Sequence, residues 1–229
     1  MRHSSLVRTM IRSWSYYSLV VVLPLAMIVQ GCATPEETVK KSQGYYQEGL
    51  ATLDSDKQKS FVSFQKALQI NPQNKEAHYG LGHLLAGQGK WAQAEEHFRA
   101  ALDLDPDYSE AHTFLGQVLE REDRWPEAVQ EFRLALSNPL YATPDLARFH
   151  LGRALAHEGD YHGAMEALED ALVVNPPHVP PALSHLELGR VYYKLGFERR
   201  AKEALTKVTT LDKNGEYAAA AKELLVKLK

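Results

Sequence analysis

Residues 75–108 read KEAHYGLGHLLAGQGKWAQAEEHFRAALDLDPDY, and residues 109–142 read SEAHTFLGQVLEREDRWPEAVQEFRLALSNPLYA. Aligned without a gap, the two segments carry the same kinds of residue at the same or nearly the same offsets. The shared positions are His78 and His112, Leu81-Gly82 and Leu115-Gly116, Trp91 and Trp125, Ala94 and Ala128, Phe98 and Phe132, and Pro106 and Pro139. Self-similarity at a fixed spacing predicts stacked structural units instead of one globular core.

The spacing of 34 residues, with the order Leu-Gly, large residue, Ala, aromatic and Pro, resembles the tetratricopeptide repeat, a helix hairpin. One hairpin cannot bury its apolar face, so stacking must supply the core. The resemblance therefore predicts an all-α solenoid of about five hairpins and a C-terminal capping helix. We expect repeats over about 42–74, 75–108, 109–142, 145–178 and 182–215, and the cap over 216–229.

Three glycines mark the turn inside a hairpin. Gly89, Gly159 and Gly196 fall where the first helix of a repeat should end. A helix often ends at a residue in the left-handed conformation, which Gly adopts without steric cost. We therefore expect these glycines to have positive φ angles.

The first 31 residues differ from the rest of the chain. Arg2, Arg8 and Arg12 precede the apolar run Leu19–Val29, and the first acidic residue is Glu36. A positive segment before a short apolar run is typical of a secretory signal. A run of eleven residues is also too short to cross a bilayer core of roughly 30 Å. Residues 1–31 are thus predicted to be a signal peptide.

Cys32 is the only cysteine of the chain and directly follows the apolar run and Gly31. The segment from Val29 to Cys32 resembles a bacterial lipobox, which implies that Cys32 receives diacylglycerol and becomes the first mature residue. Residues 32–41 then form the lipidated Cys and a short polar tether. Ala33 resembles the second residue of lipoproteins released to the outer membrane, so we expect a lipid anchor on its periplasmic face.

Composition limits the function classes. The 229-residue chain has 26 Lys and Arg against 29 Asp and Glu, a net charge of −3. This balance offers no basic footprint for phosphates, so a nucleic-acid partner is not expected. The segment from His157 to His162 lacks the spacing of a zinc-binding pair, and no nucleophile lies in a recognisable setting. We expect no catalytic residue, no metal and no cofactor, and a protein that is not an enzyme.

A partner is expected on the concave face, which the first helix of each repeat should line. Counting from each Leu-Gly pair predicts aromatic, Leu and Arg side chains there, a composition typical of a protein-binding surface. The expected ligand is a peptide or helix of another protein. The predicted groove residues are Tyr46, Leu50, Tyr79, His83, Gln117, Arg121, Leu146, Phe149, Arg153, Leu186, Arg190 and Tyr193.

The third and fourth repeats are joined by the sequence NPLYATP, residues 138–144. This connection is similar to one in the type IV pilus biogenesis and stability lipoproteins, the PilW, PilF or Tgl pilotins. The similarity runs in repeat order from the lipobox to the last helix. It implies a non-catalytic outer-membrane lipoprotein that binds a secretin subunit or another pilus assembly protein and promotes secretin localisation and assembly.

Two other classes of tetratricopeptide-repeat lipoprotein fit the anchor and the repeats. One is a scaffold of the outer-membrane protein assembly complex, and the other is a regulator of cell-wall synthesis. Neither accounts for the connection at 138–144. The pilotins usually have six repeats, whereas the sixth is reduced here to about one helix.

Overall fold

The computed structural model describes residues 34–228, so the predicted signal over 1–31 and the lipidation site Cys32 lie outside the described part. Within that part the chain forms eleven α-helices and no strand. None of these helices combines the length and the apolar character needed to cross a membrane. The helices are α1 (Pro35–Thr52), α2 (Lys57–Ile70), α3 (Lys75–Gly87), α4 (Trp91–Leu104), α5 (Ser109–Arg121), α6 (Trp125–Ser137), α7 (Pro144–His157), α8 (Tyr161–Ala171), α9 (Pro181–Lys194), α10 (Glu198–Leu211) and α11 (Glu216–Lys227).

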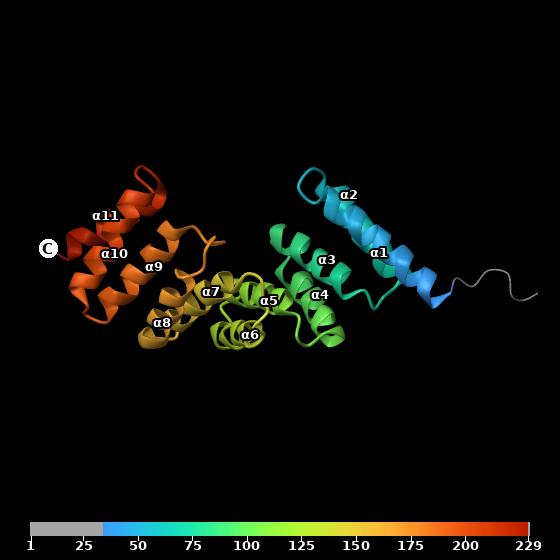
Figure 1. The fold of residues 1–229 in the computed structure, drawn as a ribbon, viewed down its shortest axis with the longest axis horizontal. Helices are drawn as coiled ribbons and strands as arrows, with labels where there is room; N and C mark the ends of the chain where they lie inside the picture. Colours follow the sequence, from blue (N-terminus) through green and yellow to red (C-terminus); the bar gives the residue numbers. More distant parts are fainter. Residues whose placement is uncertain (1–33, 229) are drawn as a thin grey trace, which may run out of the picture.

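The helices stack as hairpins in two layers. Each odd-numbered helix from α1 to α9 packs on the even-numbered helix after it, and α11 packs on α9 and α10. Odd-numbered helices also pack closely on the next odd-numbered helix, whereas the even-numbered helices of the described chain meet only through side chains, such as Arg200 of α10 and Glu169 of α8. The odd-numbered helices therefore form the inner layer of the bent, elongated array in Figure 1. This arrangement confirms the predicted all-α solenoid.

Each of the last four hairpins turns at a residue with left-handed backbone. Gly89, Gly159 and Gly196 have φ angles of 74°, 86° and 76°, which confirms the predicted turns. In the third hairpin Asp123 occupies the equivalent place with a φ of 59°. Asp is one of the few residues with a side chain that visits this region, so the turn is kept without Gly.

One contact recurs in all five hairpins and forms their core. A side chain of the second helix packs against a Gly of the first helix, and this side chain is fully buried each time. A Cβ added at Gly116 would lie 2.5 Å from the Phe132 ring, and one added at Gly82 would lie 2.8 Å from the Phe98 ring. The five buried side chains are Phe64, Phe98, Phe132, Leu168 and Leu205. We call this the Gly–ring contact, although Leu replaces the ring in the last two hairpins.

The predicted polar tether is wrong over residues 35–41, which belong to α1. The sequence carries a strong helix start here, because Thr34 and Glu37 cap one another reciprocally and Pro35 takes the first helical position. The Thr34 hydroxyl accepts from the Glu37 N–H at 3.2 Å, and the Glu37 carboxylate accepts from the Thr34 N–H at 3.0 Å. Ser42 is buried and donates to a carbonyl of α2, so this segment is part of the first hairpin.

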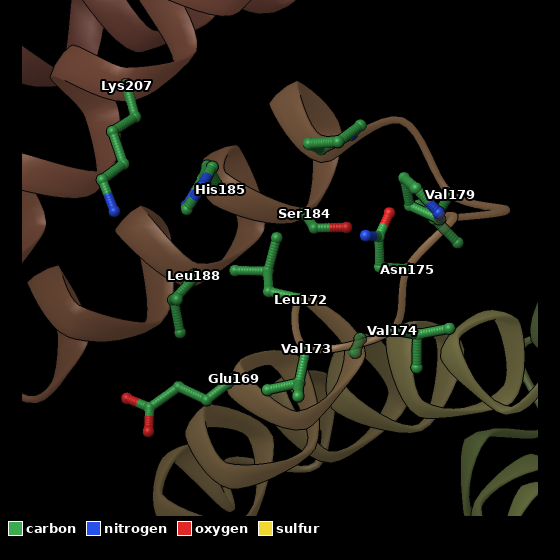
Figure 2. A pocket seen from close by; sticks show the side chains of 13 residues that line it. Glu169, Leu172, Val173, Val174, Asn175, Val179, Ser184, His185, Leu188 and Lys207 are labelled. Atoms are coloured by element: carbon green, nitrogen blue, oxygen red, sulfur yellow. The ribbon is translucent and has the colours of Figure 1, made fainter.

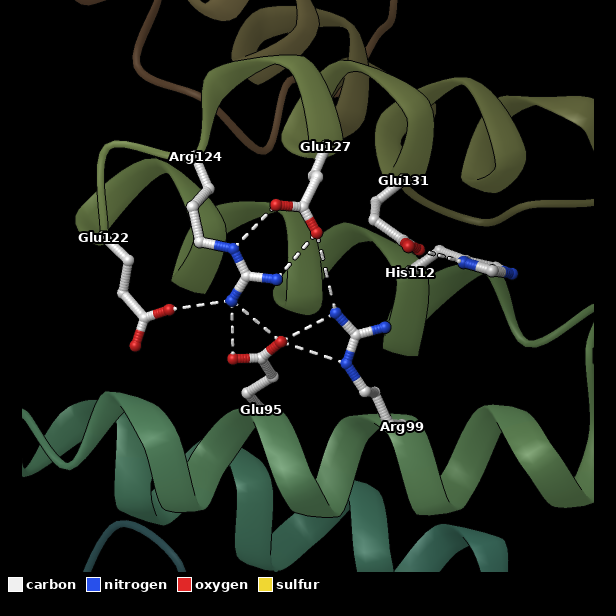
Figure 3. A network of polar contacts seen from close by, with 7 residues as sticks. All are labelled: Glu95, Arg99, His112, Glu122, Arg124, Glu127 and Glu131. Atoms are coloured by element: carbon white, nitrogen blue, oxygen red, sulfur yellow. Dashed lines mark hydrogen bonds and ion pairs between the residues drawn. The ribbon is translucent and has the colours of Figure 1, made fainter.

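An ionic network joins the outer layers of the second and third hairpins (Figure 3). Arg124, just before α6, donates to Glu95 of α4 at 2.8 and 2.9 Å and to Glu127 at 2.6 and 2.8 Å. Arg99 of α4 also donates to Glu95, at 2.7 Å. Burial raises the pKa of Glu95, but hydrogen bonds from Arg99 and Arg124 outweigh burial and lower it. The network thus ties neighbouring repeats whose second helices meet only through side chains.

The histidine at the start of the repeat signature has opposite surroundings in two repeats. In α5, His112 hydrogen-bonds through Nδ1 to Glu131 at 2.6 Å and through Nε2 to the Pro106 carbonyl at 2.9 Å. Burial lowers the pKa of His112, but these two bonds outweigh burial and raise it. In α3, His78 faces His97 at 3.0 Å, and burial leaves its pKa lowered. One repeat position therefore favours the charged imidazole in one repeat and the neutral form in another.

The Gly–ring contact predicts a large cost for a single methyl group. We expect Gly116→Ala to lower the free energy of unfolding by about 1–3 kcal/mol, because the added Cβ would overlap the Phe132 ring. Gly44→Ala is the control, since a Cβ there meets nothing within 4 Å and Ala favours a helix interior by roughly 0.5–1 kcal/mol. Urea unfolding of both variants measures the difference. Equal effects at the two sites would contradict the contact.

The raised pKa of His112 predicts a pH-dependent gain in stability. A group whose folded pKa is raised stabilises the fold fully below its ordinary pKa of 6.5, and this gain is lost as pH rises through the folded pKa. We therefore expect Glu131→Gln to cost about 1–2 kcal/mol at pH 5.5 and much less at pH 8.5. The free energy of unfolding of this variant, measured from pH 5.5 to pH 8.5, tests the expectation. Glu166→Gln, at an exposed residue, is the control. A pH-independent cost would be inconsistent with a charged His112.

Candidate partner-binding groove

The inner layer carries a column of side chains at one repeat position. The residue after the Gly of each Leu-Gly pair, and its counterpart in α1, falls on the inner face of the odd-numbered helices. We call this the central column: Leu50, His83, Gln117, Arg153 and Arg190. Their side chains are partly or fully exposed, as the sequence led us to expect. The column runs the length of the array and changes from apolar to cationic towards the C-terminus.

A hollow of about 230 Å³ lies between the second and third hairpins. Trp91, at the start of α4, and Phe114 of α5 supply its aromatic lining. His83 and Gln117 of the central column and Arg121 supply its polar lining. The Gln117 amide nitrogen is buried and has no hydrogen-bond partner within the described chain. A buried donor without a partner is rare, and it is suited to receive a carbonyl or carboxylate oxygen.

A second hollow of about 270 Å³ repeats this construction between the fourth and fifth hairpins. Tyr161 stands at the repeat position of Trp91, and Lys194 stands at that of Arg121. The central-column residues of this hollow are Arg153 and Arg190. Trp125 of the third hairpin also lines it.

The Trp125 indole nitrogen is buried and finds no hydrogen-bond partner among residues 34–228. His157 of α7 stacks on the same indole, with ring centroids 4.1 Å apart. Each hollow therefore combines aromatic surface, at least one cation and one unused donor.

The cations of this inner face differ in how far they are neutralised. Arg190 donates to Glu187 at 2.7 Å, and Arg153 lies 3.7 Å from the buried carboxylate of Glu120. Arg121 and Lys194 form no ion pair with any residue that the structure describes. The inner face of the third to fifth hairpins thus presents positive charge that acidic groups could approach.

Glu120 fixes the helix spacing beneath this face. Its side chain is only 5% exposed, and its Oε2 accepts from His150 of α7 at 2.7 Å. The contact joins α5 to α7 below the exposed arginine Arg153. Removal of one partner would leave the other as a buried polar group without this hydrogen bond, so the pair stabilises the relative position of α5 and α7.

Two predicted groove residues are wrong because the structure buries them. Phe149 and Leu186 are each 3% exposed and belong to the core between hairpins. Both lie three residues before the Gly of their Leu-Gly pair, and the next hairpin covers this position. Leu146 is also partly buried against the core. Phe149 and Leu186 therefore stabilise the stack and are not free to touch a partner.

Of the other predicted residues outside the central column, two tyrosines pack on core rings and a third is exposed. Tyr46 lies 5.8 Å from the Phe64 ring, and Tyr79 packs on Phe98 with centroids 6.0 Å apart. Desolvation and the nearby Glu110 raise the pKa of Tyr79, which keeps its hydroxyl protonated. Tyr193 is 40% exposed but lines neither hollow.

Sequence reasoning missed the aromatic linings, Trp91, Trp125 and Tyr161. Each stands nine residues after the Gly of a Leu-Gly pair, a regular signal that we assigned to the repeat signature alone. No three His, Cys, Asp or Glu side chains within residues 34–228 are arranged to hold a metal ion.

The repeats are recognised by comparison with known families. Three family models, each described as tetratricopeptide repeat, match residues 58–97, residues 79–146, and residues 147–178 and 182–214. A comparison with curated protein sequences finds no significant match.

Several solved structures have a similar fold. One is PilW, described as a widely conserved type IV pilus biogenesis factor, which is 24% identical to this chain with a TM-score of 0.69. The match covers 82% of this chain and 91% of the PilW chain. PilF of Pseudomonas aeruginosa is 23% identical over 84% of this chain and 92% of its own, with a TM-score of 0.68. YrrB, described as a TPR protein with an unusual peptide-binding site, is 22% identical over 82% and 95%, with a TM-score of 0.65. With matching repeats across 58–178 and 182–214, the chain belongs to the tetratricopeptide-repeat proteins, whose stacked hairpins bind protein partners.

Proposed function

We propose that this protein is a non-catalytic outer-membrane lipoprotein that serves type IV pilus assembly as a pilotin. In this role its inner face binds a segment of the pilus secretin and promotes localisation and assembly of the secretin in the outer membrane. The lipobox-like segment ending at Cys32 and the connection at 138–144 support the proposal. The fold likeness to PilW and PilF is consistent with it.

The observation that carries the binding role is the pair of equivalent hollows on the inner face. Each holds aromatic surface for an apolar side chain and an unused buried N–H, from Gln117 or Trp125. An extended segment could place apolar side chains in both hollows while its carbonyl oxygens accept these hydrogen bonds. Arg121 and Lys194 would attract acidic residues of the same segment.

Charge reversal on this face is expected to weaken secretin binding. With the full chain in its own pilus-forming host, we expect Arg121→Glu combined with Arg190→Glu to reduce secretin capture at least about tenfold, because both residues line the hollows. Secretin multimers in the outer membrane and surface pili should fall in parallel. The measurements are co-purification with the secretin and quantification of the multimers.

Arg133→Glu combined with Lys202→Glu is the matched control, since both residues are exposed on outer-layer helices. Both double variants should keep the thermal unfolding temperature of the wild type within a few degrees. Unchanged secretin capture by the inner-face variant would refute the chosen surface. Broad loss of outer-membrane barrel proteins on gene deletion, with normal piliation, would instead favour a scaffold of the outer-membrane assembly machinery.

The anchor is testable separately. We expect Cys32→Ala to abolish incorporation of a labelled fatty acid and to remove the protein from the outer-membrane fraction, because the thiol is the proposed acyl acceptor. Ala33→Ser keeps the thiol and should retain the label. Metabolic labelling with cell fractionation measures both results. A Cys32→Ala chain that still carries the fatty acid would disprove lipidation at this residue.

A further inference from the structure

The link between the fourth and fifth hairpins differs from the other connections. Residues 172–180 join α8 to α9, whereas residues 71–74 and 105–108 suffice between earlier hairpins. The longer link borders a hollow of about 510 Å³, the largest of those described above. No residue of this hollow lines either hollow of the inner face. It is therefore a separate feature of the molecule.

The link is held in place by a buried carboxylate. Asp145, at the start of α7, is 1% exposed and accepts from the backbone N–H of His178 at 2.6 Å and of Val179 at 3.2 Å. The His178 ring adds a hydrogen bond at 2.8 Å from Nδ1. Burial raises the pKa of Asp145, but these bonds outweigh burial and lower it, so the carboxylate stays charged. The wall that the link forms is thus pre-organised.

The hollow has an apolar wall. Figure 2 shows Leu172, Val173 and Val174 of the link across from Leu188 of α9. Val173 is 79% exposed and adds apolar surface to this wall. Covering Leu172, Val173 and Val174 would remove apolar surface from water and stabilise a complex.

The same hollow has unused polar groups on the side of α9 and α10. Lys207 forms no ion pair with any described residue, and the buried Nδ1 of His185 lacks a hydrogen-bond partner there. Desolvation lowers the pKa of His185, and the positive charge of Lys207 lowers it further. The neutral imidazole can donate a hydrogen from Nδ1, beside a cation that favours an anion.

The carboxylate that borders the hollow is already engaged. Glu169 of α8 accepts a hydrogen bond from Arg200 at 2.7 Å and another from the Tyr192 hydroxyl. The Arg200 charge offsets the charge of Glu169, so Lys207 remains available to a ligand. At the rim, Asn175 is exposed, and its amide can both donate to and accept from a peptide group.

We propose that this hollow is a second binding site, which takes a protein segment with an Asp or Glu beside an apolar side chain. The carboxylate pairs with Lys207 and accepts a hydrogen bond from His185 Nδ1. The apolar side chain covers Leu172, Val173 and Val174. This site is independent of the secretin proposal, because it uses none of the residues of the inner face.

Selection from a displayed library of random, C-terminally amidated peptides tests the site. The full wild-type chain is the target, and peptides that also bind the Lys207→Glu chain are removed by counter-selection. We expect the enriched peptides to share an acidic residue next to an apolar one. Their affinity should fall at least about tenfold in Lys207→Glu, as for a close charge pair made repulsive.

Lys202→Glu is the matched control, because Lys202 is exposed on the same helix, α10, but does not line the hollow. It should change affinity by less than about twofold. A milder variant, His185→Gln, should also weaken binding while thermal unfolding stays close to wild type. Enriched peptides without acidic residues would overturn the proposal, and so would a selection that yields no peptide dependent on Lys207.

Discussion

The structure depends on one steric constraint, the fit of a buried ring or Leu side chain against a residue without a Cβ. In every hairpin this contact sets the distance between the two helices, and the covered side chain is fully buried. Because each repeat packs only on its neighbours, an error in one hairpin changes the angle at which all later hairpins continue. Both inner-face hollows lie between consecutive hairpins and are lined by residues of their first and second helices, so their shape requires that each hairpin is closed correctly.

Repetition explains why so much of the fold could be predicted. The Leu-Gly pairs, the ring positions and the turn glycines recur at fixed spacing, so local signals in one repeat support those in the next. Burial at the groove could not be predicted in this way. Phe149 and Arg153 are four residues apart on one helix and only about 40° apart around its axis. Whether the next hairpin covers one and leaves the other exposed is a tertiary property that spacing alone does not encode.

Equivalent positions of different repeats differ in their chemical surroundings, and these differences distinguish this molecule from others with the same fold. His112 and His78 occupy the same repeat position, but a carboxylate faces one and a second imidazole faces the other. Likewise, the central column begins with Leu50 and ends with Arg190, so the groove has an apolar end and a cationic end. A shared scaffold thus permits local chemistry to vary without any change of fold, which is why resemblance in fold says little about the partner.

The early start of α1 has a consequence for the position of the array. Pro35 is the third residue after Cys32, and three residues of chain can reach at most about 10 Å. If Cys32 holds the lipid that we propose, the start of the first hairpin lies within about 10 Å of the headgroups. Because the hairpins form one continuous stack, the cationic groove residues would then lie towards the end of the array that is farthest from the lipid anchor.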